Sequence, residues 1–287
     1  MKRIGFIGVG IMGASMVRNL MKHGYEVSVY TRTKEKAQEV IAEGAIWCDS
    51  VAECSKNQDA IITIVGYPSD VEEVYLSETG ILANANEGTY VIDMTTSSPK
   101  LAAHIFEEAK KKGLRSLDAP VTGGDTGAKA GTLTILVGGE EADFTVCKPL
   151  FEAMGKNIVY MGQAGNGQHA KLANQIAIAG TVAGATEALL YAKKSGLDTD
   201  TVLGAISTGA AGSYQLSTVA PRALAGDFAP GFFIKHFIKD MSLAVEESTG
   251  FEQALPILEH VLSMYKELED NGMGDLGTQS LSKYYER

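Results

Sequence analysis

A glycine-rich run near the N-terminus has the residue types and spacing that bind a phosphate group. It comprises Gly8, Val9, Gly10, Ile11, Met12 and Gly13, and it follows a β-rich segment and precedes an amphipathic helical pattern. In such a context the first Gly forms a tight turn, the second admits a pyrophosphate and the third lets helix and strand pack closely. The helix N-terminus then offers N–H groups to the anion. We expect these six residues to bind a dinucleotide; the alternative is a glycine-rich turn without a ligand.

The end of the next predicted strand indicates which dinucleotide binds. The strand Glu26–Tyr30 is followed by Thr31, Arg32 and Thr33, and no acid occurs until Glu35. A carboxylate at this position would hold the ribose 2′-hydroxyl of NAD. Arg32 can instead meet a 2′-phosphate with a bidentate fork, and the two threonines can add hydroxyl donors. The sequence therefore predicts NADP (NADPH), although a solvated surface arginine is the alternative.

Alternating elements in the first half of the chain position these residues. Predicted strands are Arg3–Gly8, Glu26–Tyr30, Ala60–Val65, Tyr90–Asp93, Ser116–Asp118, Thr132–Val137 and Ile158–Met161. Helical patterns lie between several of them, and such alternation implies a mostly parallel sheet with helices on both faces. We predict an α/β Rossmann-type, doubly wound dinucleotide-binding domain over residues 1–163.

The pattern changes after Met161, because β-rich runs are replaced by helical ones. One long Ala-rich helix is predicted over Asn166–Ser195, and further helices over residues 198–207, 235–249 and 256–271. We predict an all-α domain over 164–287. Gly180 and Gly184 lower helix propensity, so we expect another helix to pack on them, from the same domain, a partner subunit or both. A homo-oligomer, dimer or tetramer, is expected.

Length and charge restrict the class of protein. The chain has 287 residues, enough for two domains, and a formal net charge of −10. Such an acidic chain is a poor candidate for binding nucleic acid or an anionic membrane. Cys48, Cys54 and Cys147 have no metal-binding spacing, so we expect reduced thiols, no metal and a cytoplasmic location. The most apolar stretch, Ile176–Ala192, carries a glutamate and is interpreted as a buried helix.

Four motifs, in order, resemble those of the β-hydroxyacid dehydrogenase family. They are Gly5–Gly13, Asp118–Gly124, Gly162–Asn174 and Lys239–Met241. The family includes 3-hydroxyisobutyrate dehydrogenase, tartronate semialdehyde reductase and the glyoxylate/succinic semialdehyde reductases. The resemblance covers essentially the whole chain, and four ordered motifs are far more specific than one.

The resemblance implies that Lys171 and Asn174 are catalytic. They lie three residues apart in a predicted helix and therefore share one face. Hydride transfer to a carbonyl leaves an alkoxide, to which a lysine can donate a proton, and it can remove one in the oxidative direction. The amide of Asn174 can hold the substrate oxygen or the lysine. Apolar neighbours on the helix argue against an ordinary surface lysine.

The resemblance also implies further binding residues. The hydroxyl of Thr122 and the backbone of Gly123 and Gly124 can form an anion-binding concavity, which in the family takes the substrate carboxylate. Ser is commoner at position 122 in the family, so pocket size differs slightly. The other implied substrate residues are Phe232, for which ordinary core packing is the alternative, and Asp240. Implied cofactor residues are Val65, Gly66, Thr96 and Lys239.

These features predict an NADP-dependent enzyme that acts on a small carboxylate-bearing substrate. Reduction of a short semialdehyde is favoured over oxidation of 3-hydroxyisobutyrate or a related 3-hydroxy acid. A 6-phosphogluconate dehydrogenase is disfavoured because Leu172-Ala173-Asn174 follows the lysine where that enzyme has His-Asn-Gly. Imine reductases share the fold but typically lack the lysine. A non-catalytic NADP-binding sensor is the remaining alternative.

Overall fold

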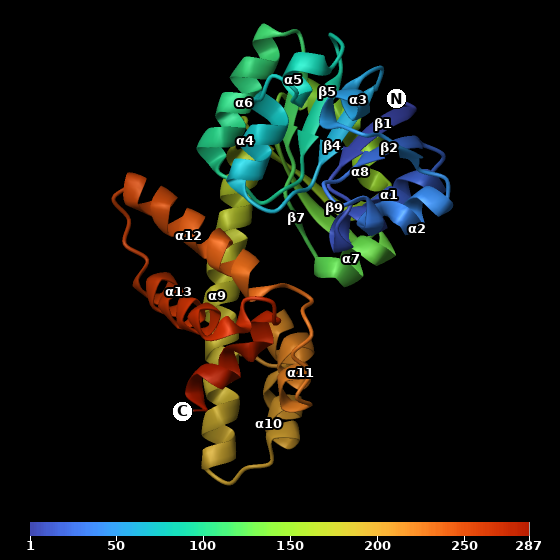
Figure 1. Cartoon of the computed structure of the whole chain (residues 1–287). Coiled ribbons are helices and arrows are strands. Elements are labelled where there is room, and N and C mark those ends of the chain that lie inside the picture. The colour runs from blue at the N-terminus through green and yellow to red at the C-terminus, as the bar shows by residue number, and fades with distance from the viewer. Residues whose placement is uncertain (287) are drawn as a thin grey trace. The chain divides into compact units, whose positions relative to one another are not determined.

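The computed structural model describes residues 1–286 (Figure 1). The chain divides into two compact units, Met1–Lys171 and Leu172–Arg287. This division falls inside the long helix α9 (Asn166–Lys194), whereas the boundary expected from the sequence lies between residues 163 and 164. An α/β Rossmann-like unit followed by a helical one confirms the predicted fold class.

The first unit contains one nine-stranded sheet in the order β3-β2-β1-β4-β5-β6-β8-β7, with β9 paired to β8. The strands are β1 (Arg3–Ile7), β2 (Glu26–Tyr30), β3 (Ile46–Trp47), β4 (Ala60–Thr63), β5 (Tyr90–Asp93), β6 (Arg115–Asp118), β7 (Val121–Thr122), β8 (Leu133–Gly139) and β9 (Gly155–Gly162). β1 to β6 pair in parallel, β8 is antiparallel to β6 and β7, and β9 is parallel to β8. The strands β3 and β7 are not predicted from the sequence, because two residues are too few to show a periodicity.

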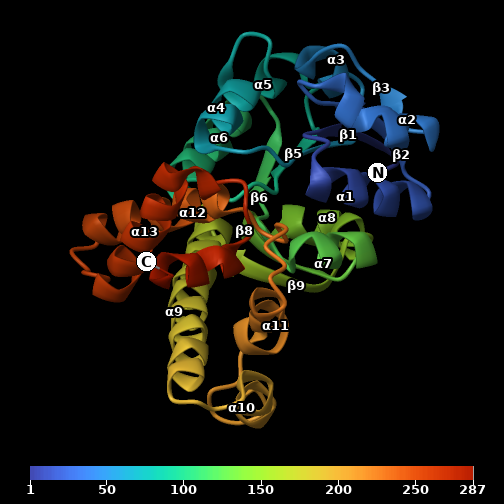
Figure 2. The same cartoon turned by 60° about the horizontal axis from the view of Figure 1, so that its bottom comes forward.

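Helices cover both faces of this sheet (Figures 1 and 2). They are α1 (Ile11–Lys22), α2 (Gln38–Ala42), α3 (Val51–Ser55), α4 (Pro68–Leu76), α5 (Ile81–Asn84), α6 (Pro99–Lys111), α7 (Gly124–Ala130) and α8 (Glu141–Glu152), with a 3-10 turn at Lys34–Ala37. Successive residues of a strand point to opposite faces. Ile4 and Phe6 of β1 therefore pack in the core with α1 and α8, whereas Ile7 packs in the core with α4 and α6.

Within the described residues of the second unit, helices are joined by loops, and the β-structure is the isolated bridge between Phe233 and Gly277. The unit contains the rest of α9, α10 (Thr199–Ile206), α11 (Ala220–Leu224), α12 (Ile234–Gly250) and α13 (Pro256–Leu268), with π-helical turns at Gln215–Val219 and Glu269–Met273 and a 3-10 segment at Thr278–Tyr285. Its core is formed by apolar side chains of α9, α12 and α13, such as Ala179, Phe237 and Tyr265. The helix predicted to reach residue 271 is α-helical as far as Leu268 and continues as the π-helical turn Glu269–Met273, in which the backbone leaves helical geometry at Asn271 and Gly272.

The structure bears on one expectation about α9, the close packing of another helix on Gly180 and Gly184. Outside the neighbouring backbone of α9 itself, a Cβ atom added at Gly180 or Gly184 would meet no described atom within 4 Å, so no other helix of the second unit packs closely there. Both glycines instead line an open groove of about 400 Å³ beside α13, together with residues that include Ala183, Glu187 and Met264. The partner-subunit explanation stays a prediction.

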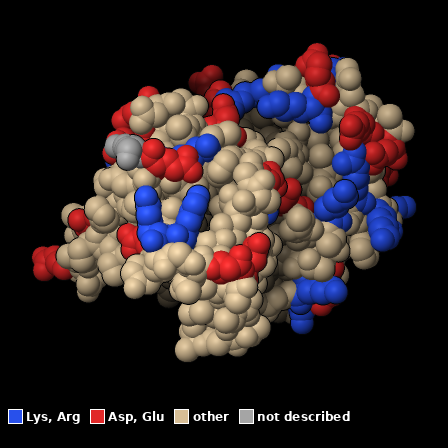
Figure 3. Space-filling view, turned by 90° about the horizontal axis from the view of Figure 1, so that it is seen from below, with Lys and Arg blue, Asp and Glu red and all other residues tan. Residues whose placement is uncertain are grey.

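Three further observations concern the charged surface, the helices and the cysteines. On the face shown in Figure 3, acidic and basic side chains are interspersed and separated by uncharged surface. None of the helices within residues 1–286 is long and apolar enough to span a membrane. All three cysteines are buried free thiols.

Candidate active site

The glycine-rich loop joins β1 to α1 and leaves an open N-terminus on that helix. Gly8 has a φ of +106°, and a side chain there would collide with the carbonyl oxygen of Ile64. A side chain at Gly13 would collide with the carbonyl oxygen of Gly8, whereas one at Gly10 would meet nothing within 4 Å in the described chain. Gly10 is the N-cap, and the described residues supply neither a side-chain cap nor an acid in the first turn. The loop thus fits a pyrophosphate.

The remaining residues of the glycine-rich loop differ in which of their atoms can face a ligand. The side chain of Val9 is fully buried in the core, so only its backbone can face a ligand. Ile11 is exposed, and Met12 is partly buried against the core. The Gly8 N–H donates to the carbonyl of Tyr30 at 2.9 Å, which fixes the loop to the end of β2.

Arg32 follows that strand end and lies beside an acid that sequence analysis missed. Its Nη1 lies 3.0 Å from Oδ1 of Asp70, in the first turn of α4. Oδ2 of Asp70 accepts the Tyr67 N–H at 3.0 Å, so the carboxylate is held in place as a helix cap. The side chain of Arg32 is 73% exposed. Of its neighbours, Thr31 is half-buried and Thr33 is exposed. Asp70 was missed because it is 38 residues away in the sequence.

A buried carboxylate organises the carboxyl ends of β4 and β5. Oδ1 of Asp93 accepts a hydrogen bond from Thr63 Oγ1 at 2.8 Å and from the Thr95 N–H at 3.1 Å. Thr95 Oγ1 in turn accepts the Val65 N–H at 3.0 Å. Burial raises the pKa of Asp93 to about 6, although its hydrogen bonds to Thr95 and Thr63 oppose the shift. These contacts fix the two loops that carry the predicted cofactor residues, Val65, Gly66 and Thr96.

The next strand end holds the beginning of α9. Oδ1 of Asp118 accepts the Gly165 N–H at 2.7 Å, and Oδ2 accepts the Gln168 N–H at 2.9 Å. The start of α9 lies close to Asp118, because a Cβ atom added at Gly167 would lie 2.8 Å from this carboxylate and from the Asp118 carbonyl oxygen. Burial raises the pKa of Asp118, whereas the backbone hydrogen bonds oppose this shift. The second strand-end carboxylate thus anchors the helix that carries Lys171.

Lys171 is the last residue of the first unit and lies one helical turn after Gln168. Its side chain is buried, with a relative exposure of 7% for the residue. Few lysines are this buried, because a buried ammonium group loses its hydration. Burial of this kind separates Lys171 from an ordinary surface lysine and suits a group with a chemical role.

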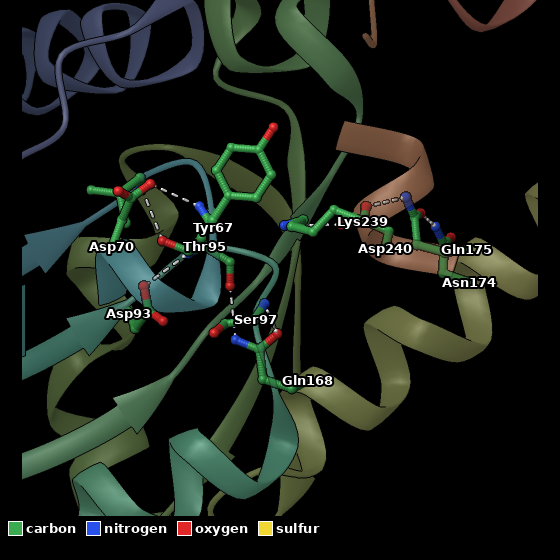
Figure 4. A network of polar contacts seen from close by, with 11 residues as sticks. Tyr67, Asp70, Asp93, Thr95, Ser97, Gln168, Asn174, Gln175, Lys239 and Asp240 are labelled. Atoms are coloured by element: carbon green, nitrogen blue, oxygen red, sulfur yellow. Dashed lines mark hydrogen bonds and ion pairs between the residues drawn. The ribbon is translucent and has the colours of Figure 1, made fainter. Parts of the chain in front are cut away.

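In the second unit, a chain of polar contacts links Asn174 to α12 (Figure 4). Asn174 Nδ2 donates to Gln175 Oε1 at 2.8 Å, and Gln175 Nε2 donates to Asp240 Oδ2 at 2.6 Å. Oδ1 of Asp240 lies 3.0 Å from Lys239 Nζ, an ion pair without hydrogen-bond geometry. Asp240 is 1% exposed and both of its oxygens already have partners, so it is suited to orienting the Asn174 amide.

The predicted carboxylate-binding segment connects β7 to α7. Thr122 ends β7 and is half-buried, and α7 begins at Gly124. Gly123 and Gly124 have φ values of +129° and +64°, a region that favours glycine. Successive backbone N–H groups in such a turn can cradle an anion. Phe232 is partly buried and packs 5.6 Å from the Phe237 ring, so at least part of its surface belongs to the core.

Comparisons with known proteins agree with this arrangement. A family model described as the NAD binding domain of 6-phosphogluconate dehydrogenase matches residues 3–162, and one described as NAD-binding of NADP-dependent 3-hydroxyisobutyrate dehydrogenase matches 165–285. YkwC of Bacillus subtilis, described as an uncharacterized oxidoreductase, is 55% identical, covering 99% of both chains. The 2-hydroxy-3-oxopropionate reductase of Escherichia coli is 36% identical, covering 97% of this chain and 95% of that one. A solved structure of 3-hydroxyisobutyrate dehydrogenase from Mycobacterium tuberculosis with L-serine has a TM-score of 0.91 and 30% identity over 100% of both chains.

No group of three or more His, Cys, Asp or Glu residues within the described chain is arranged to hold a metal ion. The glycine-rich loop is suited to binding an anion, and the buried Lys171 is suited to moving a proton.

Proposed function

This chain belongs to the family of NAD(P)-dependent β-hydroxyacid dehydrogenases, and within it we propose an NADP(H)-dependent reductase of short, carboxylate-bearing semialdehydes. The observation that carries the proposal is the buried Lys171, one turn into a helix anchored to a strand end of the Rossmann-like unit. Ligands bind at the carboxyl ends of strands in sheets of this kind. A lysine held there is suited to exchange a proton with a bound substrate.

Each group of residues then has a chemical task. The Gly8–Gly13 loop and the N-terminus of α1 bind the pyrophosphate, and Arg32 binds the 2′-phosphate. When bound, the reduced nicotinamide supplies a hydride to the substrate carbonyl carbon. Lys171 donates a proton to the carbonyl oxygen, which becomes the hydroxyl of the product. Asn174 holds that oxygen through its amide, and the turn Thr122–Gly124 binds the substrate carboxylate.

Two relatives support different substrates within this class. The Escherichia coli relative is a reductase of a semialdehyde, 2-hydroxy-3-oxopropionate, and favours the reductive assignment. The Mycobacterium tuberculosis structure is of a 3-hydroxyisobutyrate dehydrogenase, so oxidation of a branched 3-hydroxy acid is the second candidate. A difference of one methylene changes discrimination by only about 1–3 kcal/mol, which the fold alone does not determine.

The test combines a substrate panel with Lys171→Ala. Glyoxylate, succinic semialdehyde and tartronate semialdehyde are assayed with NADPH and NADH, and 3-hydroxyisobutyrate with NADP and NAD. We expect the highest kcat/KM for a semialdehyde with NADPH. Lys171→Ala should bind NADPH normally and lose about 10²–10⁴-fold in kcat. A variant within twofold of the wild type would refute the role of Lys171, and highest activity on 3-hydroxyisobutyrate would favour the second candidate.

A further inference from the structure

The side-chain amide of Gln168 makes two hydrogen bonds to a single loop (Figure 4). Its Nε2 donates to the carbonyl oxygen of Thr95 at 2.8 Å, and its Oε1 accepts the Ser97 N–H at 2.9 Å. The side chain has no exposed surface. One amide therefore fixes the backbone on both sides of Thr96.

The backbone of Gln168 is anchored separately. Its N–H donates to Asp118 Oδ2, and the preceding Gly165 N–H donates to Asp118 Oδ1. Asp118 ends β6, whereas the Thr95–Ser97 loop follows β5, the neighbouring strand. The first turn of α9 is thus bonded to two adjacent strand ends. Lys171 follows Gln168 by three residues and lies on the same side of the helix.

We propose that Gln168 is a positioning residue for proton transfer, which fixes the turn bearing Lys171 relative to the loop bearing Thr96. The inference rests on the proposed function, in which Lys171 is the proton donor, and on the family resemblance, which implies that Thr96 contacts the cofactor. Proton transfer requires hydrogen-bond reach of about 2.6–3.2 Å. A misplacement of about 1 Å can cost about 10²-fold in rate. Gln168 acts through other residues, because both polar atoms of its side chain are already bonded to the loop.

The variant Gln168→Met removes both side-chain hydrogen bonds and keeps a similar volume. We expect kcat to fall about 10- to 100-fold, whereas KM and the Kd for NADPH change less than about threefold. Thr89→Val is the matched control, because it removes a partly buried 3.1 Å hydrogen bond from Thr89 Oγ1 to the Gln58 carbonyl, just before β5. The control should lower the melting temperature and leave kcat unchanged. A Gln168→Met protein with kcat within twofold of the wild type would overturn the proposal.

A second variant keeps the test valid if Gln168→Met fails to fold. Gln168→Asn retains the amide but is shorter by one methylene, so it cannot span to Thr95 and Ser97 from the same helical position. We again expect an effect on kcat and not on KM. The value of kcat should fall about tenfold or more, and KM should be retained. Loss of NADPH binding in proportion to kcat would mean a merely structural role and would overturn the proposal.

A double-mutant cycle distinguishes this inference from the proposed function. In a Lys171→Ala background, Gln168→Met should cause no further loss of kcat, because the donor to be positioned is gone. Independent, multiplicative losses would overturn the positioning role alone. A Lys171→Ala protein with nearly wild-type activity would refute the proposed function, and this inference with it.

Discussion

The guanidinium of Arg32, at the end of β2, lies 3.0 Å from the carboxylate of Asp70, in the first turn of α4. Asp70 therefore places a negative charge where the proposed 2′-phosphate would bind, and it competes with that phosphate for Arg32. Exposed ion pairs of this kind stabilise a fold by only about 0–1 kcal/mol. The pair therefore contributes little to stability, and its main consequence is this competition for Arg32.

Replacing Arg32 tests the choice of cofactor. Charge-assisted hydrogen bonds contribute about 1.5–3 kcal/mol, so Arg32→Ala should weaken NADP binding roughly 10- to 100-fold and change NAD binding little. Calorimetric titration with both dinucleotides measures the two constants. Equal weakening of both would show that Arg32 does not read the 2′-phosphate.

Asp70→Asn is the complementary control for that prediction. Asparagine can still accept the Tyr67 N–H that Asp70 now accepts, so the helix cap is preserved while the charge is lost. Removal of a repulsive carboxylate should strengthen NADP binding and leave NAD binding unchanged.

The turn Thr122–Gly124 gives a prediction for substrate binding. Thr122→Ala should raise KM for a carboxylate-bearing substrate about tenfold or more, because a hydroxyl donor to an anion is lost, and leave kcat within a few-fold. Thr122→Ser keeps the hydroxyl and should behave like the wild type. An aldehyde without a carboxylate serves as the control substrate. If its KM rose equally with Thr122→Ala, Thr122 would not contact the carboxylate.

Burial of Asp93 predicts how stability depends on pH. Its pKa is raised from 3.8 to about 6, so the unfolded chain releases this proton at lower pH than the folded protein. The carboxyl therefore lowers stability as pH rises from about 4 to about 6, by about 3 kcal/mol at most. Asp93→Asn lacks this dependence. Urea unfolding at several pH values should show the variant gaining stability relative to the wild type across that window; parallel curves would contradict the burial argument.

The open face of α9, where Gly184 lies, gives two separate predictions, one for the folding of a single chain and one for the size of an assembly. Gly184→Leu finds no described atom within 4 Å of the new Cβ, and it raises helix propensity by about 1 kcal/mol. A single chain should therefore fold normally. If a partner subunit covers this face, as the sequence predicts, light scattering should show a smaller assembly for Gly184→Leu. An unchanged oligomer would place the subunit interface elsewhere.

Periodicity and glycine spacing predicted most of the fold. The strands Glu26–Tyr30 and Tyr90–Asp93 occur with the expected bounds, and α9 begins at Asn166 as expected and ends one residue early. These elements are long enough, or are bounded sharply enough, for local patterns to define them. The two-residue strands β3 and β7 depend on pairing with distant strands, which no local pattern contains.

The polar network was less predictable than the motifs that it supports. Asp118 was noticed as part of a motif, yet its role in anchoring α9 depends on Gly165 and Gln168, almost fifty residues later. From the sequence, Asp93 is predicted only as the last residue of a strand. Its burial in the structure reveals that it organises two loops. Such residues bond to backbone groups across the sheet, so their partners follow from topology.

The anchoring of α9 also bears on where the chain can be cut. A fragment that stopped at residue 163 would contain every strand, since β9 ends at Gly162. It would nevertheless lose the Gly165 and Gln168 N–H groups that bond to Asp118, leaving a buried carboxylate without these donors, a loss that typically costs 1–3 kcal/mol or more. The Rossmann-like unit therefore does not end with its last strand. Limited proteolysis within the first turn of α9 should loosen the sheet at β6, whereas cleavage beyond Lys171 should leave β6 in place.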